Sequence, residues 1–257
     1  MFVGVNGRLL RVLDVGHGDR VLVAHGGWVG GAELWQQQVE LLTQRGWRVV
    51  TFDHRGSGQS PAKAANVSVD GLVDDLEAIL DRFGIERCVL GGISMGTVPA
   101  MRVALRVPDR VEGLVLVGAT ARWPKWQVLP LVAGLTAFYR GTLSAFGALA
   151  IVEPDVRKRV RRWFRQVARQ ASPKAARAMM RSLAGTDLRE DVRSLHTPAL
   201  VIHGTRDLIV LPRFARELAE LLPNGELKLL RGAGHLPTLT RPREIADAVH
   251  ARFGSDS

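Results

Sequence analysis

One serine of this chain has a glycine two residues away on each side, and it lies between a predicted strand and a predicted helix. The pentapeptide Gly-Ile-Ser-Met-Gly spans residues 92–96, an apolar run at 87–91 precedes it, and a helix-like stretch at 97–107 follows it. At such a turn, larger side chains at 92 and 96 would clash with the neighbouring strand and helix, and the serine can be held in a strained backbone conformation with its hydroxyl exposed. The pattern predicts that Ser94 is a nucleophile.

Serine is a poor nucleophile unless a base lies within hydrogen-bond distance and an acid orients that base. Two loops that follow predicted strands supply these groups. His235 follows a strand at 226–230, and Asp207 follows a strand at 198–203. Because sites in an open parallel sheet form beyond the carboxyl ends of its strands, we expect Ser94, Asp207 and His235 to form a catalytic triad in that chain order.

Negative charge that develops on a substrate oxygen needs hydrogen-bond donors. The backbone N–H of Met95 lies at the start of the helix that follows the nucleophile, where the helix dipole adds a favourable potential. A second donor is expected from the loop His-Gly-Gly-Trp at residues 25–28, after a strand at 20–24. Glycine lets a backbone amide approach a ligand closely, so the N–H of Gly27 is the first choice and that of Trp28 is the alternative.

Other polar residues near the same edge of the sheet have structural interpretations. His203 ends a strand and is expected to be a hydrogen-bonded structural histidine, and His25 is expected to brace the loop beside the oxyanion donors. His54 is expected at the surface, whereas Asp53 and Arg55 are expected to brace their own turn by an ion pair. None of these five residues is therefore expected to take part in the chemistry.

Short apolar runs alternate with amphipathic segments over most of the chain, which is typical of parallel strands buried between two layers of helices. After a hairpin that turns at Asn6-Gly7, the expected strands lie at 20–24, 47–52, 87–91, 114–117, 198–203 and 226–230. The expected helices lie at 34–46, 69–83, 97–107, 212–222 and 242–253. The fold class is therefore α/β, with a mostly parallel central sheet flanked by helices on both sides.

This alternation stops after Thr120 and returns at Pro198. The residues from 121 to 190 are expected to be helical throughout, with helix starts at Pro154 and Pro173. The chain is thus divided into a core domain, residues 1–120 and 191–257, and an inserted all-helical segment, residues 121–190.

The composition of the 257-residue chain, 46% hydrophobic and 23% charged, is that of an ordinary globular protein. The single cysteine, Cys88, excludes an internal disulfide, and neither a signal peptide nor a transmembrane helix is expected, so the predicted location is cytoplasmic. The net charge is +10, and the basic residues at 157–169 are interpreted as a solvated helix face, with an anionic partner as the alternative. Metal-ligand spacing, a dinucleotide-binding glycine loop and nucleic-acid motifs are not found, so no metal, cofactor or nucleic acid is expected.

In these features the chain resembles the α/β-hydrolase superfamily, in its lidded branch of single-domain esterases, lactonases and perhydrolases. The resemblance rests on five ordered motifs: His-Gly-Gly-Trp at 25–28, Asp-His-Arg-Gly-Ser-Gly-Gln-Ser at 53–60, Gly-Ile-Ser-Met-Gly at 92–96, His-Gly-Thr-Arg-Asp at 203–207 and Gly-Ala-Gly-His at 232–235. It implies the α/β-hydrolase fold, and it implies that residues 121–190 form a cap over Ser94. The Gly-Gly-Gly loop of many lipases is absent, so bulky tertiary-alcohol esters are not implied.

The favoured function is therefore hydrolysis of a carboxylic ester or lactone of a small, largely apolar substrate through an acyl-enzyme. The candidates for substrate binding are Trp28, Trp126 and Phe138. Two alternatives stay open: hydrolysis of a carbon–carbon bond or cofactor-free perhydrolysis by the same three residues, and a ligand receptor with little turnover. The expected partner is a small-molecule substrate, without nucleic acid or stable membrane insertion, and the expected assembly is a monomer or a homodimer.

Overall fold

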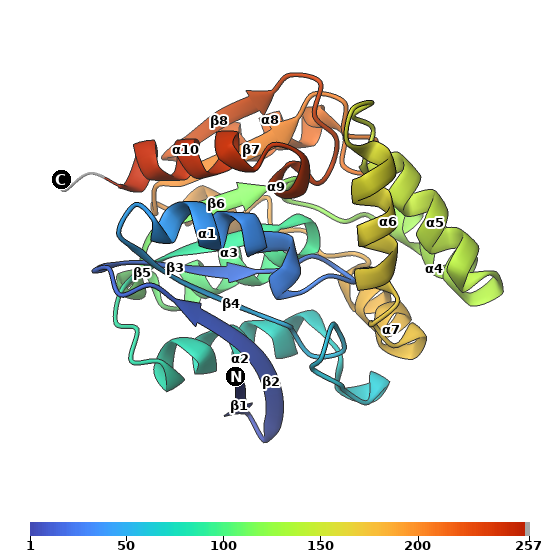
Figure 1. Cartoon of the computed structure of the whole chain (residues 1–257), viewed down its shortest axis with the longest axis horizontal. Helices are drawn as coiled ribbons and strands as arrows, with labels where there is room; N and C mark the ends of the chain where they lie inside the picture. Colours follow the sequence, from blue (N-terminus) through green and yellow to red (C-terminus); the bar gives the residue numbers. More distant parts are fainter. Residues whose placement is uncertain (255–257) are drawn as a thin grey trace.

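The computed structural model describes residues 1–254, and its centre is an eight-stranded sheet with the order β1-β2-β4-β3-β5-β6-β7-β8 (Figure 1). The strands from β3 to β8 run parallel to one another, whereas β2 pairs antiparallel with both β1 and β4. The mostly parallel sheet expected from the sequence is therefore confirmed. The strands are β1 (Phe2–Val5), β2 (Arg8–Val15), β3 (Arg20–His25), β4 (Trp47–Phe52), β5 (Cys88–Ile93), β6 (Val111–Val117), β7 (Ala199–Gly204) and β8 (Gly225–Leu230).

The hairpin of β1 and β2 turns at Asn6 and Gly7, whose φ angles of 47° and 71° both lie in the left-handed region. Two such residues form the turn that matches the twist of antiparallel strands, which explains the Asn-Gly sequence. Strands β5 and β7 are buried along their whole length, which explains why their sequences do not alternate and are apolar except for His203. Strand β5, which leads to Ser94, lies inside the sheet between β3 and β6.

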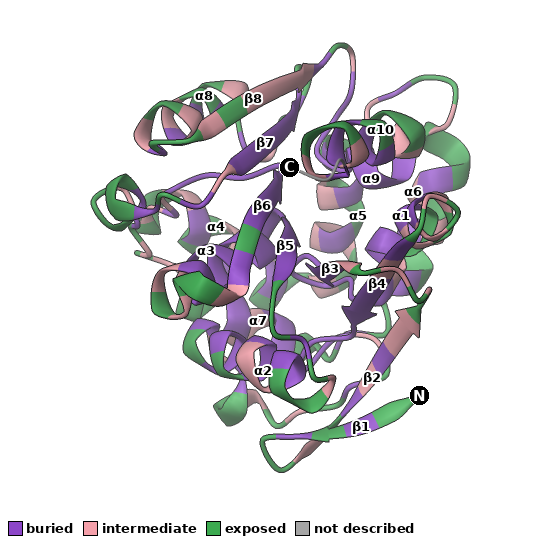
Figure 2. Cartoon of the chain, turned by 90° about the vertical axis from the view of Figure 1, so that its left-hand side faces the viewer, coloured by how far each residue is buried: buried purple, intermediate pink, exposed green. Residues whose placement is uncertain are grey.

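Helices cover both faces of the sheet, with their buried sides turned toward it (Figure 2). Helices α1 and α10 pack against each other on one face, and α2 and α3 pack against each other on the opposite face. These layers are formed by α1 (Gln36–Thr43), α2 (Val69–Arg82), α3 (Thr97–Arg106), α8 (Pro212–Leu221) and α10 (Pro242–Phe253). A short helix, α9 (Pro237–Thr240), is additional to the helices expected from the sequence.

Four further helices lie together between β6 and β7 in the chain: α4 (Lys125–Ala137), α5 (Tyr139–Ala150), α6 (Arg157–Ala168) and α7 (Pro173–Leu183) (Figure 1). The segment is not helical throughout, because residues 151–156 separate α5 from α6. Pro154 was expected to start a helix, but it lies in a turn before α6, whereas Pro173 is the first residue of α7 as expected. No helix within residues 1–254 is both long enough and apolar enough to cross a membrane.

This helical insertion, defined here as residues 121–190, leaves and re-enters the core through two adjacent extended segments. The N–H of Leu188 donates to the carbonyl of Ala121 at 2.8 Å, and the N–H of Trp123 donates to the carbonyl of Thr186 at 2.8 Å. Both ends of the insertion are therefore tied to each other at the point where they join the sheet.

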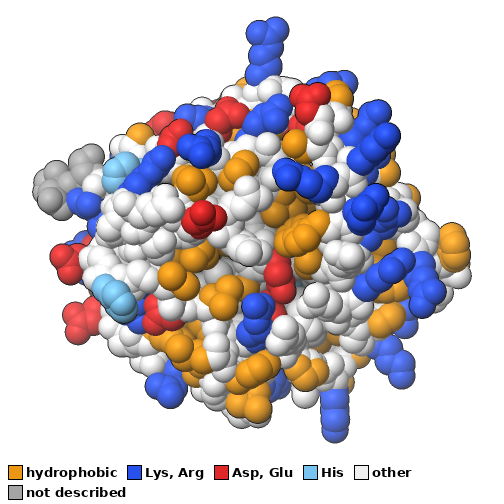
Figure 3. All heavy atoms as spheres, viewed as in Figure 1, with side chains coloured by type: hydrophobic (Ala, Val, Ile, Leu, Met, Phe, Trp, Pro, Cys, Tyr) orange, Lys and Arg blue, Asp and Glu red, His pale blue; other side chains and the backbone are white. Residues whose placement is uncertain are grey.

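The excess positive charge of the chain lies in the insertion. Residues 121–190 hold 14 Lys or Arg and 4 Asp or Glu, and the rest of the chain holds 21 of each, so the net charge of +10 belongs to the insertion alone. Basic side chains gather on the side of the molecule where α5 and α6 lie (Figure 3). Helix α6 packs its apolar side inward and exposes its basic side, as the solvated-face interpretation predicts.

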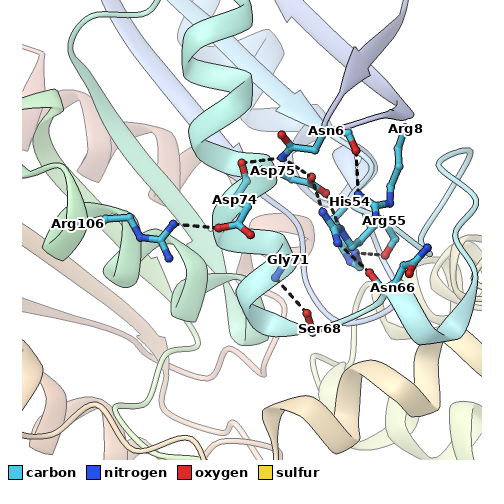
Figure 4. Close-up of polar contacts among 10 residues, drawn as sticks. All are labelled: Asn6, Arg8, His54, Arg55, Asn66, Ser68, Gly71, Asp74, Asp75 and Arg106. Carbon is cyan, nitrogen blue, oxygen red and sulfur yellow. Dashed lines mark hydrogen bonds and ion pairs between the residues drawn. The ribbon is translucent and has the colours of Figure 1, made fainter.

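Asp53 and Arg55 do not pair with each other, contrary to expectation, because α2 offers the guanidinium a buried carboxylate. Arg55 donates to both carboxylate oxygens of Asp75, at 2.6 and 2.7 Å (Figure 4). Asp53 instead accepts a hydrogen bond from the backbone N–H of Ala32 at 3.0 Å. Both side chains therefore tie the loop at residues 53–60 to other parts of the core.

We expect Asp75→Ala to lower the free energy of unfolding by about 3–5 kcal/mol, because it leaves the Arg55 charge buried without a partner. The neighbouring Asp74 provides a matched control, since it pairs with Arg106 at the surface at 3.0 Å (Figure 4). Asp74→Ala is expected to cost no more than about 1 kcal/mol. Urea unfolding followed by circular dichroism measures both changes, and equal losses for the two variants would contradict a special contribution of the buried pair.

Candidate active site

Ser94 follows β5 and begins a short 3₁₀ turn, Ser94–Gly96, that leads into α3. Its φ of 54° lies in the left-handed region, which costs a non-glycine residue roughly 1–2 kcal/mol. The flanking glycines leave room for this turn: a Cβ at Gly92 would clash with the carbonyl of Gly96, and a Cβ at Gly96 would clash with the carbonyl of Gly26. The strained strand-to-helix turn that the pentapeptide predicts is present in the structure.

Three side chains form a hydrogen-bonded chain at this turn. Nε2 of His235 lies 2.8 Å from Oγ of Ser94, and Nδ1 of His235 lies 2.7 Å from Oδ2 of Asp207. All three residues are buried. When Nδ1–H donates to the carboxylate, Nε2 can accept the hydroxyl proton, as a base that activates an alcohol must do. The structure thus brings together the residues that the sequence suggests as nucleophile, base and acid.

Asp207 lies just beyond β7 and is held by several donors. Its Oδ1 accepts the N–H groups of Ile209 and Val210, at 2.8 and 3.0 Å, and its Oδ2 lies 3.2 Å from Nε2 of His203. Burial by itself would raise the pKa of Asp207, but the neighbouring His235 and His203 outweigh burial and hold this pKa well below its usual value. Asp207 is therefore an anion at neutral pH. His203 supports it structurally, and its Nε2 also lies 2.8 Å from the Val210 carbonyl.

The loop after β3 lies against the nucleophile turn, since a Cβ on Gly27 would come within 3.6 Å of the carbonyl of Ile93. The N–H groups of Gly27 and Trp28 donate no hydrogen bond to any residue between 1 and 254. The N–H of Met95 lies in the first turn after Ser94, where helical N–H groups have no partner within the helix. All three N–H groups are thus free to bind a substrate oxygen.

His54 is buried beneath this loop and not at the surface, which corrects the expectation from the sequence. Its Nε2–H donates to the carbonyl of Gly27 at 2.8 Å, and its ring stacks on that of His25 with the centroids 5.2 Å apart. The C=O and N–H of a trans peptide point in opposite directions. By holding the Gly27 carbonyl, His54 therefore fixes the direction of the Trp28 N–H.

His25, the last residue of β3, is buried against the nucleophile turn, and its Nδ1 lies 2.8 Å from the carbonyl of Gly26. Burial is the largest influence on this ring, and the nearby His54 adds to it, so that the pKa of His25 is lowered to about 3. Burial lowers the pKa of His54 as well. Both rings therefore stay neutral at physiological pH and support the loop without charge.

We expect the protein to lose stability as the pH falls from 6.5 toward 3. In this window the unfolded chain binds a proton on His25 that the folded chain does not bind, so the free energy of unfolding falls by up to about 1.4 kcal/mol per pH unit from this residue. Urea unfolding between pH 4 and pH 8 measures the slope. Ring-proton NMR of His25 supplies the direct test, and a titration of this ring near neutrality would contradict the prediction.

An aromatic side chain of the insertion covers His235. The ring centroid of Phe146, on α5, lies 6.2 Å from that of His235 and 5.4 Å from that of Trp28. Trp28 is itself bound to the insertion, because its Nε1–H donates to the carbonyl of Ala176 at 2.8 Å. The candidate substrate-binding residue Trp28 therefore contacts an aromatic residue of the insertion that also contacts His235.

Trp126 and Phe138 were predicted to contact the substrate, but the structure leaves most of both side chains exposed to solvent. Their side chains are 71% and 70% exposed, at the start and just beyond the end of α4. Apolar residues occur on every side of this helix, and the side that packs inward carries Val128 and Leu135 instead. Pocket residues on such a helix cannot be chosen from the sequence, because its apolar pattern does not define a buried face.

One supporting residue, Glu153, was missed by the sequence analysis. Phe146 is one of several aromatic residues of the insertion that could line a pocket, and only its contact with His235 distinguishes it. Glu153 is a buried carboxylate that belongs to no motif, and two of its three hydrogen-bond partners lie more than 80 residues away in the chain. Within residues 1–254, no group of three or more His, Cys, Asp or Glu side chains is suited to hold a metal ion.

The chain is similar to known proteins over most of its length. The family model described as "Serine aminopeptidase, S33" matches residues 17–239 of the chain. A pimeloyl-[acyl-carrier protein] methyl ester esterase from Nitrosomonas europaea is 30% identical, with 94% of this chain and 98% of that protein covered.

Solved structures show the same architecture. An esterase from Exiguobacterium antarcticum superimposes with a TM-score of 0.92 at 22% identity, covering 99% of both chains. A bromoperoxidase from Bacillus anthracis superimposes with a TM-score of 0.90 at 25% identity, covering 96% of both chains. The similarity thus extends over the insertion as well as the sheet.

Proposed function

The chain belongs to the α/β-hydrolase family whose model is described as serine aminopeptidase S33, and we propose that it hydrolyses a carboxylic ester or lactone of a small, largely apolar substrate through an acyl-enzyme. The observation that carries this proposal is the chain of hydrogen bonds from Ser94 through His235 to Asp207. The similarity to a methyl ester esterase supports an ester as the substrate class.

In the proposed reaction, Oγ of Ser94 attacks the carbonyl carbon of the ester while Nε2 of His235 takes the hydroxyl proton. The resulting oxyanion binds the N–H of Met95 and one N–H of the loop after β3, from Gly27 or Trp28. His235 then gives its proton to the departing alcohol oxygen, which leaves an acyl group on Ser94. Water, deprotonated by His235, releases the acid and restores the serine.

We assign residues 121–190 as the cap of this site. Phe146 contacts His235 and Trp28, and Trp28 is bound to α7 of the insertion, so aromatic side chains from the insertion and the core pack together next to the proposed base. This lining favours an apolar acyl or alcohol group. The basic side chains of α6 face solvent and not Ser94, so they do not require an anionic substrate.

The proposed function is tested by two measurements on the purified protein. A chromogenic short-chain ester should give a burst of alcohol about equal to the enzyme concentration if deacylation is slower than acylation. A fluorophosphonate probe should label one residue, and peptide mass spectrometry should place the label on Ser94. Labelling elsewhere, or turnover of no ester or lactone in a panel of varied chain length, would overturn the proposal.

Perhydrolysis is a second candidate, because the chain is similar to a protein described as a bromoperoxidase. In this reaction hydrogen peroxide would replace water in the attack on the acyl-enzyme, so an ester would give a peracid with no change in the three residues. Bromide oxidation in a mixture of acetate, peroxide and enzyme detects the peracid. Ester turnover that is unaffected by peroxide, with no oxidation of bromide, would exclude this candidate.

A further inference from the structure

Glu153 is a buried carboxylate that the insertion extends into the core. It lies between α5 and α6, and its side chain is almost completely buried, with 2% of the residue exposed. Its Oε1 accepts the N–H of Gly234 at 2.8 Å and the hydroxyl of Thr240 at 2.6 Å, and its Oε2 accepts the N–H of Val152 at 3.0 Å. Two of these three donors belong to the segment that carries His235.

A second bond from the same part of the insertion reaches His235 itself. The backbone N–H of His235 donates to the carbonyl of Ala150 at 2.8 Å. The approach is close, because a Cβ on Gly234 would lie 2.5 Å from this carbonyl and 3.2 Å from a methyl group of Val152. Residues 150–153 therefore hold the backbone on both sides of the peptide bond between Gly234 and His235.

The His235 ring must satisfy two partners at once, Ser94 at 2.8 Å and Asp207 at 2.7 Å. The earlier part of the loop that carries it is held by the core, since the N–H of Gly232 donates to Oγ1 of Thr205 at 2.8 Å and the carbonyl of Ala233 accepts the N–H of Arg206 at 2.9 Å. The N–H groups of Gly234 and His235 are held by the insertion instead. A displacement of about 1 Å in a catalytic group is enough to reduce a rate by roughly 100-fold. Glu153 holds Gly234, the residue directly before His235, and so opposes such a displacement.

We propose that Glu153 is a positioning residue for His235: the carboxylate from the insertion fixes the loop at Gly234 and Thr240, so that the imidazole reaches both the serine and the aspartate. This inference rests on the proposed function. The whole of residues 150–153 then acts as a fixed joint between the two domains, and any opening of the cap occurs away from this joint.

The chemistry of the three donors explains why a carboxylate occupies this place. Two backbone N–H groups and a hydroxyl that donates require a group that only accepts, and an ionised carboxylate offers two such oxygens. Glutamine has the same shape but only one accepting oxygen. Whichever way its amide is turned, an NH₂ group faces an N–H donor, and a buried donor is left unpaired.

The test compares Glu153→Gln with the wild type in steady-state kinetics on the chromogenic ester. We expect kcat to fall roughly 10- to 100-fold with little change in KM, because the substrate contacts are intact while the base is misplaced. Glu190→Gln is the matched control, since Glu190 is an exposed glutamate of the same insertion. The pH profile of kcat/KM, which reports the base of the free enzyme, is expected to shift in Glu153→Gln only.

A second pair of variants keeps the proposal testable if Glu153→Gln folds poorly. Thr240→Val removes the hydroxyl that binds Glu153 and keeps the shape of the side chain, whereas Thr240→Ser keeps the hydroxyl. We expect a smaller loss of kcat in Thr240→Val and recovery in Thr240→Ser. A purely structural contact would lower the melting temperature of Thr240→Val but leave its kcat and pH profile unchanged below that temperature.

Proton NMR separates this inference from the proposed function, because it needs no substrate. The Nδ1 proton of His235, in its short hydrogen bond to Asp207, is expected to resonate downfield of the amides in the wild type and to shift or broaden in Glu153→Gln. If no ester is turned over but this change is seen, the proposed function fails and the positioning role stands. If kcat, the pH profile and the resonance are all unchanged in both Glu153→Gln and Thr240→Val, the positioning role is overturned.

Discussion

Ser94→Ala is expected to reduce kcat for an activated ester by roughly 10⁶-fold, because serine and histidine of a triad act as a unit and either loss removes the acyl-enzyme route. The fluorophosphonate label should disappear together with the burst. Steady-state rates at high enzyme concentration and intact-mass spectrometry measure the two effects. Turnover in Ser94→Ala within tenfold of the wild type would contradict the assigned nucleophile, since the hydroxyl that His235 activates would then be unnecessary.

Ser94→Gly provides a control for the backbone of the same turn. It should be as inactive as Ser94→Ala, but glycine adopts a φ of 54° without the strain that a Cβ causes. We expect its free energy of unfolding to exceed that of Ser94→Ala by about 1 kcal/mol. Urea unfolding of the two inactive variants measures this difference, and a more stable alanine variant would show that the turn is relaxed.

The second large effect is expected for Asp207→Asn, which should lower kcat by about 10⁴-fold at neutral pH. The asparagine amide has the shape of the carboxylate, but it cannot be relied on to accept the Nδ1 proton of His235, and it does not stabilise the imidazolium that forms during the reaction. The exposed Asp187 supplies the control, because it pairs with Arg189 at the surface. Asp187→Asn should retain full activity.

The loss of kcat in Asp207→Asn can also be compared with the losses caused by removing Ser94 or His235. Removal of His235 should cost as much as removal of Ser94, whereas Asp207→Asn should cost less than either. Adding Asp207→Asn to Ser94→Ala should then change the residual rate very little, since the unit is already disabled. Additive losses in the double variant would mean that Asp207 acts independently of the hydrogen-bonded chain.

Much of the core could be predicted from the sequence because its signals are local. Strand β4, at 47–52, was predicted to the residue, since a strand covered on both faces is largely apolar. The turn at Ser94 was predictable because only small residues fit at 92 and 96. The meeting of Ser94, Asp207 and His235 follows from the rule that parallel strands present their carboxyl ends at one edge.

The insertion could not be predicted to the same depth. Its helices could be expected from their composition, but α4 has apolar residues on every side, so the sequence does not say which of them face the core. Trp126 and Phe138 were preferred to the other aromatic residues of the insertion and are exposed, whereas Phe146 contacts His235. Tertiary packing of the four helices decides which of these residues face the core, and no local sequence pattern indicates it.

Hydrogen-bond partners that are distant in the chain could not be predicted from the sequence either. Arg55 could have paired with the aspartate two residues before it, but it pairs with Asp75, which α2 presents from twenty residues away. His54 was expected at the surface because nothing in its neighbourhood requires burial, and its partner is the carbonyl of Gly27. A hydrogen bond to a backbone carbonyl cannot be predicted from residue types, because every residue carries such a carbonyl.

The uneven distribution of charge makes this molecule a strong electric dipole. A cation-exchange resin would meet an electrically balanced core on one side and the whole excess of +10 on the other, so adsorption would be oriented, with the insertion facing the resin. Elution would then require a higher salt concentration than a protein with the same net charge spread evenly over its surface. The reason is that many basic side chains of the insertion lie within one Debye length of the resin. Immobilisation on an anionic support would consequently hold every copy of the protein in nearly the same orientation.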